Sequence, residues 1–230
     1  MGQLAEQLEE VRAHVREASL AAGRSPDAVR LIAVSKGQPA SALREAYAAG
    51  QRDFGENYAQ ELVAKSRELA DLLDLRWHFI GHLQRNKVKD VVGAAAAVHT
   101  IDRLAVAEEL SRRAPHDLDV LVEVNIEAEP QKAGALAVDV PALARAVDAL
   151  PRLHLVGLMA IPPAGDAAEA SRPHFAALAR LAAELRADHP RLVELSMGMS
   201  QDYAVAIGEG ATLVRVGTAI FGARAPKRTG

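Results

Sequence analysis

The sequence of 230 residues contains no cysteine, few aromatic residues and no long apolar run. The absence of cysteine excludes a disulfide-stabilised fold, a thiolate metal site and a cysteine nucleophile. Aromatic residues make up 3% of the chain, which disfavours a surface that stacks nucleic-acid bases. The formal net charge is -3, so the sequence indicates neither a basic surface for nucleic acid nor an excess of charge for a membrane surface.

The amino-terminal stretch, MGQLAEQLEEVRAHV, is charged and amphipathic and does not resemble a secretory signal. The most alanine-rich segment, residues 91–98, is far shorter than the roughly 20 residues that a membrane-spanning helix needs. Half of the residues are apolar, which is enough for a sizeable core. We therefore expect a soluble cytoplasmic protein that binds neither membranes nor nucleic acid.

After a first helix, the sequence predicts a regular alternation of strands and helices. Leu4, Leu8, Val11 and Val15 recur at helical spacing, which predicts a helix over residues 3–22, and Gly23 ends it. Apolar stretches such as LIAV, VLVEV and LVGLMAI are typical of parallel strands buried on both faces. The predicted strands cover residues 30–35, 53–55, 76–80, 98–101, 119–124, 155–160, 194–197 and 213–216. The predicted helices between them begin near residues 40, 58, 86, 103, 140, 169 and 201.

Eight strands joined by helices predict an α/β fold, a (β/α)8 TIM barrel preceded by the amino-terminal helix. A doubly wound open sheet would more often stop at five or six strands. Its phosphate signature, G-x-G-x-x-G, does not follow the first strand, which runs into Ser35-Lys36-Gly37. We expect a single domain over residues 1–230, in which the barrel occupies about 29–222, ends near Phe221-Gly222 and leaves a short basic tail.

The functional residues of a barrel gather at the carboxyl ends of its strands. Lys36 directly follows the first apolar strand. Desolvation at that position favours a neutral amine, which is the nucleophile of Schiff-base chemistry. Position alone favours a simpler interpretation, a surface lysine that begins a loop, because lysines are common in loops.

The ends of the last two strands carry small and hydroxyl-bearing residues, in the corner where barrels often bind phosphate. Ser196, Ser200 and Thr218 supply hydroxyl groups, and Gly198 and Gly217 allow backbone N–H groups to approach closely. A helix that begins near residue 201 would add its amino-terminal dipole. Ordinary turn chemistry explains the same residues equally well.

A lysine after the first strand and a phosphate site after the last two are together suited to pyridoxal 5′-phosphate. Lys36 would form the aldimine, and the two strand ends would hold the phosphate. Arg215, in the last strand, is the candidate partner of the pyridine nitrogen. The alternative for Arg215 is a salt-bridged arginine inside the barrel, which is costly without a partner.

Six segments in a fixed order resemble the YggS/PROSC family of pyridoxal phosphate homeostasis proteins. They are AVSKGQP, FGENYAQE, WHFIGHLQRNK, GLMAIPP, LSMGMSQDYAVAI and VRVGTAIFGAR. The similarity extends from about Leu31 to Arg224, which is nearly the whole chain. It implies a barrel similar to the amino-terminal domain of bacterial alanine racemase.

By this resemblance Lys36 is the cofactor lysine, Asn57 lines the cofactor pocket and Arg215 faces the pyridine nitrogen. The resemblance also implies that residues of the SMGMS and VRVGT segments bind the phosphate. These residues are Ser196, Gly198, Met199, Gly217 and Thr218. Lys132, in EPQKAG, matches a lysine that the resemblance links to regulation or transfer of the cofactor. The family usually has SKTKP, GPLQSNK and ESKSG where this chain has SKGQP, GHLQRNK and PQKAG. The differences lie beside the key residues, which are themselves unchanged.

The resemblance implies a protein that binds pyridoxal 5′-phosphate, buffers it and supplies it to apoenzymes that depend on it, without strong catalysis. Arginine does not give up its proton, so a pyridine ring beside Arg215 is a weak electron sink. A racemase also needs a second base, a tyrosine from an additional domain, and Tyr47, Tyr58 and Tyr203 fall in predicted helices. Two alternatives stay open, a weak amino-acid racemase and a Schiff-base aldolase without cofactor. We expect a monomer.

The remaining candidates lie in or beside the strands. His78 and His82 have the spacing of a metal pair on a helix, but His78 lies in a predicted strand, so we expect no metal site. Strand alternation places His78 and Trp77 on opposite faces without deciding which one faces inward. His78 and Met159 are therefore secondary candidates for the pocket. Glu56 fits either a pocket acid or a partner for the dipole of the next helix.

Overall fold

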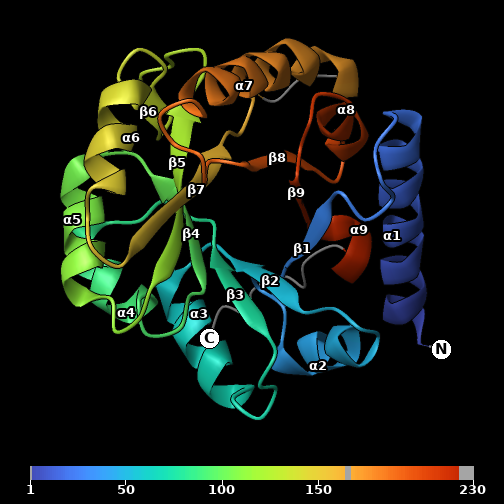
Figure 1. Cartoon of the computed structure of the whole chain (residues 1–230). Helices are drawn as coiled ribbons and strands as arrows, with labels where there is room; N and C mark the ends of the chain where they lie inside the picture. The colour runs from blue at the N-terminus through green and yellow to red at the C-terminus, as the bar shows by residue number, and fades with distance from the viewer. Residues whose placement is uncertain (1, 164–166, 223–230) are drawn as a thin grey trace.

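The computed structural model describes residues 2–163 and 167–222, and its strands form a closed barrel (Figure 1). The ring has the order β1–β2–β3–β4–β5–β7–β8–β9 and closes from β9 back to β1, and every pair is parallel. The short β6 pairs with the end of β5 outside the ring. The strands are β1 (Arg30–Val34), β2 (Asp53–Glu56), β3 (Arg76–Phe79), β4 (Ala97–Ile101), β5 (Leu118–Asn125), β6 (Ala135–Leu136), β7 (Leu153–Met159), β8 (Glu194–Met199) and β9 (Leu213–Val216).

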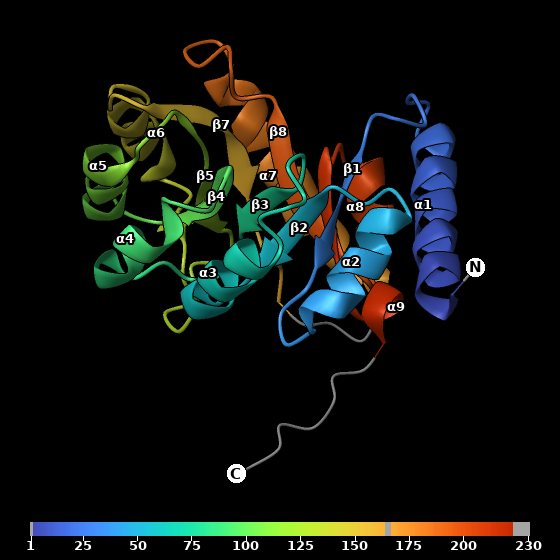
Figure 2. The ribbon, with the colours of Figure 1, turned by 90° about the horizontal axis from the view of Figure 1, so that it is seen from below.

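The helices lie outside the ring of strands (Figures 1 and 2). The α-helices are α1 (Gln3–Ala21), α2 (Ala40–Ala48), α3 (Ala59–Glu68), α4 (Val88–Val91), α5 (Leu104–Arg113), α6 (Val140–Asp148), α7 (Arg172–Leu185), α8 (Tyr203–Gly208) and α9 (Thr218–Phe221). Two 3-10 helices, η1 (Arg85–Lys87) and η2 (Ala168–Ser171), precede α4 and α7. The expected (β/α)8 barrel with a preceding helix is thus confirmed.

The boundaries depart from the sequence-based expectation at four places. The strand β6 was not predicted, because two residues carry no alternating pattern. The last strand ends at Val216, as predicted, but the helix α9 that follows it was not predicted. The helix expected from residue 169 begins as η2, and the one expected from residue 201 begins at Tyr203. The expected basic tail, residues 223–230, lies outside the described residues.

The amino-terminal helix α1 covers the place where the barrel closes. Its buried face contains Leu8, Val11 and Val15, as the helical spacing predicted, and it packs against α2, α8 and α9. Gly23, with a φ of 69°, ends the helix, and the N–H of Arg24 donates to the carbonyl of Ser19. Glycine adopts this left-handed conformation without strain, which is the usual helix-ending geometry.

Most of the apolar core lies between the strands and the helices. It is large and continuous, and Trp77 contributes to it by packing against Phe54, with ring centroids 6.1 Å apart. Trp77 therefore faces outward from the ring, and His78 faces inward. The apolar cluster inside the barrel is small, with Ile32, Leu121, Met159 and Leu213 buried in it. The remaining interior is polar, which is unusual for a barrel interior, where branched apolar residues normally dominate.

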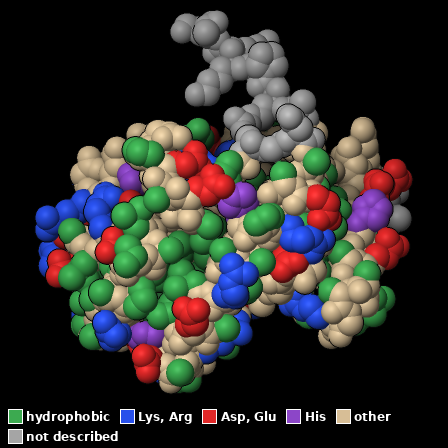
Figure 3. Space-filling view, turned by 90° about the horizontal axis from the view of Figure 1, so that it is seen from above, with side chains coloured by type: hydrophobic (Ala, Val, Ile, Leu, Met, Phe, Trp, Pro, Cys, Tyr) green, Lys and Arg blue, Asp and Glu red, His purple; other side chains and the backbone are tan. Residues whose placement is uncertain are grey.

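The outer surface shows no dominance of one charge sign on the face drawn in Figure 3, where acidic and basic side chains are interspersed. Among residues 2–163 and 167–222, none of the helices combines the length and apolar character that a membrane crossing requires.

Candidate functional site

Lys36 lies just beyond the carboxyl end of β1, and the residues on either side of it are held in place. The hydroxyl of Ser35 donates to Oε1 of Glu56 at 2.7 Å, and the carbonyl of Ser35 accepts from Nζ of Lys65 at 2.7 Å. The N–H of Gly37 donates to Oε2 of Glu61 at 2.7 Å. Lys36 itself is half-buried. These contacts fix the backbone from which the lysine side chain extends.

Glu56 has a different role from either of the two that the sequence suggested. It is fully buried and accepts from Nζ of Lys65 at 2.6 Å, so it forms an ion pair behind the strand end. Burial raises the pKa of Glu56, although the hydrogen bonds from Lys65 and Ser35 act in the opposite direction. Glu56 is therefore neither a pocket acid nor a helix cap; it braces the loop that carries Lys36.

Arg215 lies inside the barrel, and 4% of its surface is exposed. Its Nη1 donates to the hydroxyl oxygen of Ser196 at 2.6 Å, and its Nη2 donates to the carbonyl of Ala160 at 3.1 Å. Burial lowers the pKa of Arg215 to about 10, while Glu123 and Asp202 act at longer range to raise it. Among the described residues no carboxylate pairs directly with this guanidinium, so the salt-bridged alternative from the sequence is not what the structure contains.

A line of buried side chains continues from Ser196 across the barrel. Nδ1 of His99 lies 2.9 Å from the hydroxyl of Ser196, and Nε2 of His99 lies 3.0 Å from Nδ1 of His78. Nε2 of His78 lies 2.9 Å from Oδ1 of Asp53, whose other oxygen accepts from Arg76 at 2.7 Å. The strands β4 and β8 are not neighbours in the ring, so the contact between His99 and Ser196 crosses the barrel interior.

Arg215 can only donate, so the hydroxyl oxygen of Ser196 accepts from it. Burial above all lowers the pKa of His99 well below its usual value, aided by the charge of His78 when protonated and by Arg215. A neutral imidazole carries a proton on one nitrogen only, so His99 donates in one of its two contacts, with Ser196 or with His78, and accepts in the other. A hydroxyl can accept from two donors, so Arg215 alone does not set the direction of this line.

Asp53 is the last side chain of this line, and it is ionised. Burial opposes its ionisation, but hydrogen bonds from His78 and Arg76 outweigh that effect and the pKa of Asp53 lies below its usual value. Sequence reasoning named His78 but missed His99, Asp53 and Glu123. The only available signal was strand alternation, which places His78 and His99 on one face of their strands but cannot reveal that these strands bring them into contact.

The carboxyl mouth of the barrel contains a cavity of about 340 Å³. It lies at the ends of β2, β3, β5 and β7 and includes Asn57, Glu123 and Lys132 in its lining. Oδ1 of Asn57 and Oε2 of Glu123 are buried there without a hydrogen-bond partner. Buried polar atoms are nearly always paired, so two orphaned oxygens in one cavity indicate a place for a ligand or bound water.

Glu123 has the most unusual acidity in this cavity. Burial, together with the charge of Asp102 and against the opposing charge of Arg215, raises its pKa to about 7. The side chain is 7% exposed. Glu123 is therefore partly protonated near neutral pH, which makes it both a donor and an acceptor at the mouth.

The carboxyl end of β8 brings Gly198 and Met199, its last two residues, close to the start of α8. Gly198 has a φ of 92°, and a Cβ atom there would lie 2.6 Å from Cβ of Ala206, so no other residue fits without a shift. The N–H of Met199 donates to Oδ1 of Asp202 at 2.7 Å. This amide is therefore engaged by an acid, and the helix that follows begins at Tyr203 and is only six residues long. The helix whose amino-terminal dipole was expected to help bind phosphate is therefore less than two turns long.

The ends of β9 and β1 are in contact at Gly217. A Cβ atom on Gly217 would lie 3.1 Å from the carbonyl oxygen of Val34, so a small residue is required for the two strand ends to meet. Thr218 is exposed at the start of α9. Lys36 follows Val34 by two residues, so Lys36, Gly217 and Thr218 lie at adjoining strand ends.

The structure therefore brings the sequence-derived candidates to one end of the barrel, in two groups. Lys36, Ser196, Gly198, Met199, Arg215, Gly217 and Thr218 lie on β1, β8 and β9 or just after these strands. Asn57 and Lys132 line the mouth cavity, in which Nζ of Lys132 pairs with Glu129 at 2.5 Å. Met159 is fully buried beside Glu123 and Ser196 in the strand register, and His78 lies deeper in the barrel.

Metal binding has no support from the described residues, where no cluster of three or more histidine and acidic side chains has the arrangement of a metal site. His82 is exposed, with Nδ1 3.7 Å from Asp102, whereas His78 is buried and hydrogen-bonded to Asp53 and His99. The two histidines thus have separate surroundings, as their positions in and after the strand predicted.

Comparisons with known proteins agree with this geometry. The chain matches the family described as "Alanine racemase, N-terminal domain" over residues 7–225. The "Pyridoxal phosphate homeostasis protein" of Pseudomonas aeruginosa is 51% identical over 227 residues, which cover 97% of each chain. The protein of that name from Escherichia coli strain K12 is 46% identical over 231 residues, covering 97% of this chain and 98% of the relative.

A solved structure gives the same result. PipY of Synechococcus elongatus PCC7942, in a structure with PLP bound, is 43% identical to this chain. The two structures superpose with a TM-score of 0.84 and cover 96% of this chain and 100% of PipY. The chain therefore belongs to the alanine racemase N-terminal domain family and, within it, to the pyridoxal phosphate homeostasis proteins.

Proposed function

We propose that this chain binds pyridoxal 5′-phosphate at the carboxyl mouth of its barrel and helps to maintain the cell's supply of this cofactor. The relatives from Pseudomonas aeruginosa and Escherichia coli are named for that role, and the structure of PipY has been solved with PLP bound. Pyridoxal 5′-phosphate supplies an aldehyde that condenses with a primary amine and a phosphate that needs hydrogen-bond donors.

The observation that carries the proposal is the buried guanidinium of Arg215. A buried charge without a directly paired carboxylate is costly, so this group is suited to an electron-rich ligand atom inside the barrel. The residues around it fit the cofactor: Lys36 would offer the amine, and Gly198, Met199, Gly217 and Thr218 would lie around the phosphate. The hydroxyl of Ser196 contacts Arg215 and His99, so Ser196 would orient Arg215 beneath the cofactor. The orphaned oxygen of Asn57 offers a further hydrogen bond.

We infer that the chain is a carrier rather than a strong catalyst. Arg215 keeps its proton near neutral pH, because even its lowered pKa of about 10 lies well above that range, and its N–H groups donate to Ser196 and Ala160. A pyridine nitrogen facing such a group is not protonated, and the ring then withdraws few electrons from a bound amino acid. This supports a protein that binds and releases the cofactor rather than one that racemises amino acids.

The tyrosines give little support to the racemase alternative. Tyr47 pairs with Asp74 on the outside of the barrel, and Tyr203 lies near Glu10 and Glu17 of α1, which raise its pKa together with burial. Tyr58, next to Asn57, is 56% exposed.

Reduction with borohydride tests the proposal directly. Borohydride fixes the cofactor to the amine with which it has condensed, and peptide mass spectrometry then locates that amine. We expect the label on Lys36 and no measurable racemisation of L-alanine by the loaded protein. A label found only on Lys132, or labelling that requires a sugar phosphate instead of pyridoxal phosphate, would refute the assignment; the second result would support an aldolase.

The finer parts of the proposal concern partners and assembly. We propose that the chain acts as a monomer and delivers the cofactor to pyridoxal phosphate-dependent apoenzymes, in the cytoplasm where these enzymes are made. A carrier needs no site shared between subunits. Light scattering of the loaded protein should give the chain mass of 24.5 kDa, and twice that mass would refute the monomer.

A further inference from the structure

Glu123, in the lining of the mouth cavity, is a buried carboxylate without a partner. It is 7% exposed, and among the described residues it makes neither a hydrogen bond nor an ion pair. The other buried carboxylates in the same part of the chain all accept hydrogen bonds from side chains or backbone N–H groups; they are Asp53, Glu56, Glu109 and Asp202. Because buried polar groups are nearly always paired, Glu123 indicates a ligand that donates hydrogen bonds.

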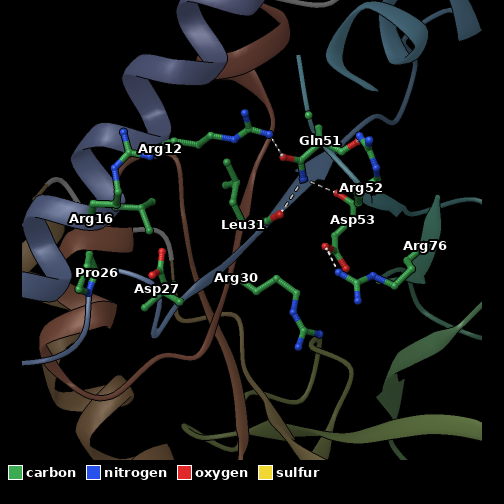
Figure 4. A pocket seen from close by; sticks show the side chains of 13 residues that line it. Arg12, Arg16, Pro26, Asp27, Arg30, Leu31, Gln51, Arg52, Asp53 and Arg76 are labelled. Carbon is green, nitrogen blue, oxygen red and sulfur yellow. Dashed lines mark hydrogen bonds and ion pairs between the residues drawn. The ribbon is translucent and has the colours of Figure 1, made fainter. Parts of the chain in front are cut away.

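A second cavity, at the amino ends of β1, β2 and β3, shows the contrast (Figure 4). Five arginines line it, and each has a carboxylate at 3.9 Å or less. Figure 4 shows one of these pairs, in which Arg76 donates to Asp53 at 2.7 Å. The arginines of that cavity are thus matched by acids, and it contains no buried charge comparable to Glu123.

The other charged side chains that line the mouth cavity are already paired with one another or with a neighbour. Two further carboxylates, Glu127 and Glu129, contribute to the lining. Glu129 pairs with Nζ of Lys132 at 2.5 Å, and Glu127 pairs with His174 of α7. The lining therefore has three carboxylates and one lysine, and the lysine is bound by an acid other than Glu123.

The charges that act on Glu123 from a longer distance do not neutralise it. Asp102 has the same sign of charge. Arg215 has the opposite sign, but its guanidinium donates its hydrogen bonds elsewhere, as described above. His82, which also lines the cavity, lies 3.7 Å from Asp102. A positively charged ligand would therefore meet a carboxylate that no side chain of the described residues competes for.

Much of the remaining lining is apolar. It includes Ile80, Ile126, Ile161, Pro162 and Pro163. The cavity of about 340 Å³ is within the range of sites for small molecules. A metal ion would need several ligand groups, and the described residues contain no cluster of three or more acidic and histidine side chains arranged for one. An organic cation with a short carbon chain matches both the carboxylate and the apolar wall.

We propose that the mouth cavity binds a small aliphatic primary amine, whose ammonium group pairs with Glu123 and whose carbon chain packs on the isoleucines and prolines of the wall. An ammonium group has three N–H donors, and its hydrogen bonds to a carboxylate are stronger than those between neutral groups. The orphaned oxygen of Asn57 is the acceptor assigned above to the cofactor, so this site rests on Glu123 alone. It does not depend on the proposed role of Lys36.

The probe for this site is n-butylamine, and isothermal titration calorimetry at about pH 8 is the measurement. An aliphatic amine with a pKa of about 10.4 is protonated at this pH. Glu123, whose pKa is about 7, is then largely ionised. The full chain is first treated with borohydride, so that any cofactor it holds cannot react with the probe. We expect one amine per chain, and Glu123→Gln should weaken binding about tenfold or more, the loss expected for one hydrogen bond between charged groups.

Glu108→Gln is the matched control, because Glu108 is exposed on α5 and does not line the cavity while the change in net charge is the same. It should bind the amine as tightly as the parent protein. Butanol, which has the same carbon chain without the charge, should bind at least about tenfold more weakly. Circular dichroism melting verifies that each variant is folded.

The proposal is overturned if the parent protein binds no amine, if butanol binds as tightly as butylamine, or if the two variants weaken binding equally. The cofactor proposal fails by a different result, the absence of a borohydride label on Lys36. The two proposals can therefore be refuted separately.

Discussion

At the scale of single residues, Ser196 connects the two halves of the polar interior. It accepts from Arg215 and contacts His99, so removing its hydroxyl leaves two buried groups without a partner. Ser196→Ala should reduce the free energy of unfolding by about 1–3 kcal/mol and weaken cofactor binding. Urea unfolding and a cofactor titration measure both effects. Ser41→Ala, at an exposed position of α2, should change neither; equal losses in the two variants would contradict this role.

Glu123 should make stability depend on pH. Its pKa is about 7 in the folded chain and 4.5 in the unfolded reference, so the folded state holds the extra proton between these values. The stabilising effect of that proton is complete below about pH 4.5 and is lost as the pH rises through about 7. At about 1.4 kcal/mol per unit, the loss is at most about 3 kcal/mol.

The test compares the parent protein with Glu123→Gln at pH 5.5 and pH 8, which lie about 1 unit above the unfolded and the folded pKa, respectively. Other groups also titrate, so the informative quantity is the difference between the two proteins. Urea unfolding should show that the free energy of unfolding falls more in the parent than in the glutamine variant. Parallel pH profiles would mean that Glu123 titrates near its ordinary value.

The site residues were predictable from the sequence to different extents. Lys36, Asn57 and the glycines after β8 and β9 follow strand ends, where barrel function is expected, so their location could be predicted. His99 could not, because its partner Ser196 is 97 residues away and the contact crosses the barrel. Glu56 was named for the wrong reason, because its pairing with Lys65 depends on how α3 packs.

At the scale of elements, the loop after β1 depends on α3. Lys65 of α3 contacts Glu56, Glu61 and the carbonyl of Ser35, so Lys65→Met leaves a buried carboxylate unpaired. We expect a loss of about 3–5 kcal/mol in the free energy of unfolding and slower capture of pyridoxal phosphate by Lys36. Chemical denaturation and stopped-flow absorbance measure these two quantities.

The double variant Glu56→Gln/Lys65→Met is the control for this prediction. Without a carboxylate in need of a partner, it should recover a large part of the lost stability, although the loop would still lack the contact to Ser35. If the single and double variants were equally unstable, the ion pair between Glu56 and Lys65 would not be the cause.

Element types were predictable where the apolar pattern was long. The strands β1, β5 and β7 have long apolar stretches, and α1 has clear helical spacing. The short elements were not predictable, because β6 is two residues long and α9 is four. Their conformation is set by the neighbours on which they pack: β6 pairs with the end of β5, and α9 packs against α1.

At the scale of the whole molecule, Arg24 joins the amino-terminal helix to the last unit of the barrel. Its Nη1 donates to the carbonyls of Ala211 at 2.7 Å and Ile207 at 3.1 Å. Arg24→Ala should therefore lower the free energy of unfolding by about 1–3 kcal/mol, measured by urea denaturation. Arg180→Ala, on the exposed side of α7, should have no effect; a similar loss there would point to net charge rather than to this junction.

The barrel as a whole has two ends with different chemistry, and the same line of side chains extends between them. Arg76 and Asp53 lie at the amino ends of β3 and β2, and Ser196 and Arg215 belong to the interior beneath the mouth. Parallel strands make this possible because all amino ends share one face and all carboxyl ends share the other. The sequence predicts the carboxyl end from the barrel rule, but it carries no comparable rule for the amino end.

The central claim is that Lys36 holds pyridoxal 5′-phosphate, and a visible absorption spectrum tests it most directly. The parent protein, mixed with the cofactor and freed of excess, should be yellow. Lys36→Ala should lose or shift that band, and Lys89→Ala, which removes an exposed lysine of α4, should keep it. A parent protein that stays colourless with the cofactor, or a Lys36→Ala variant with an unchanged band, would contradict the account.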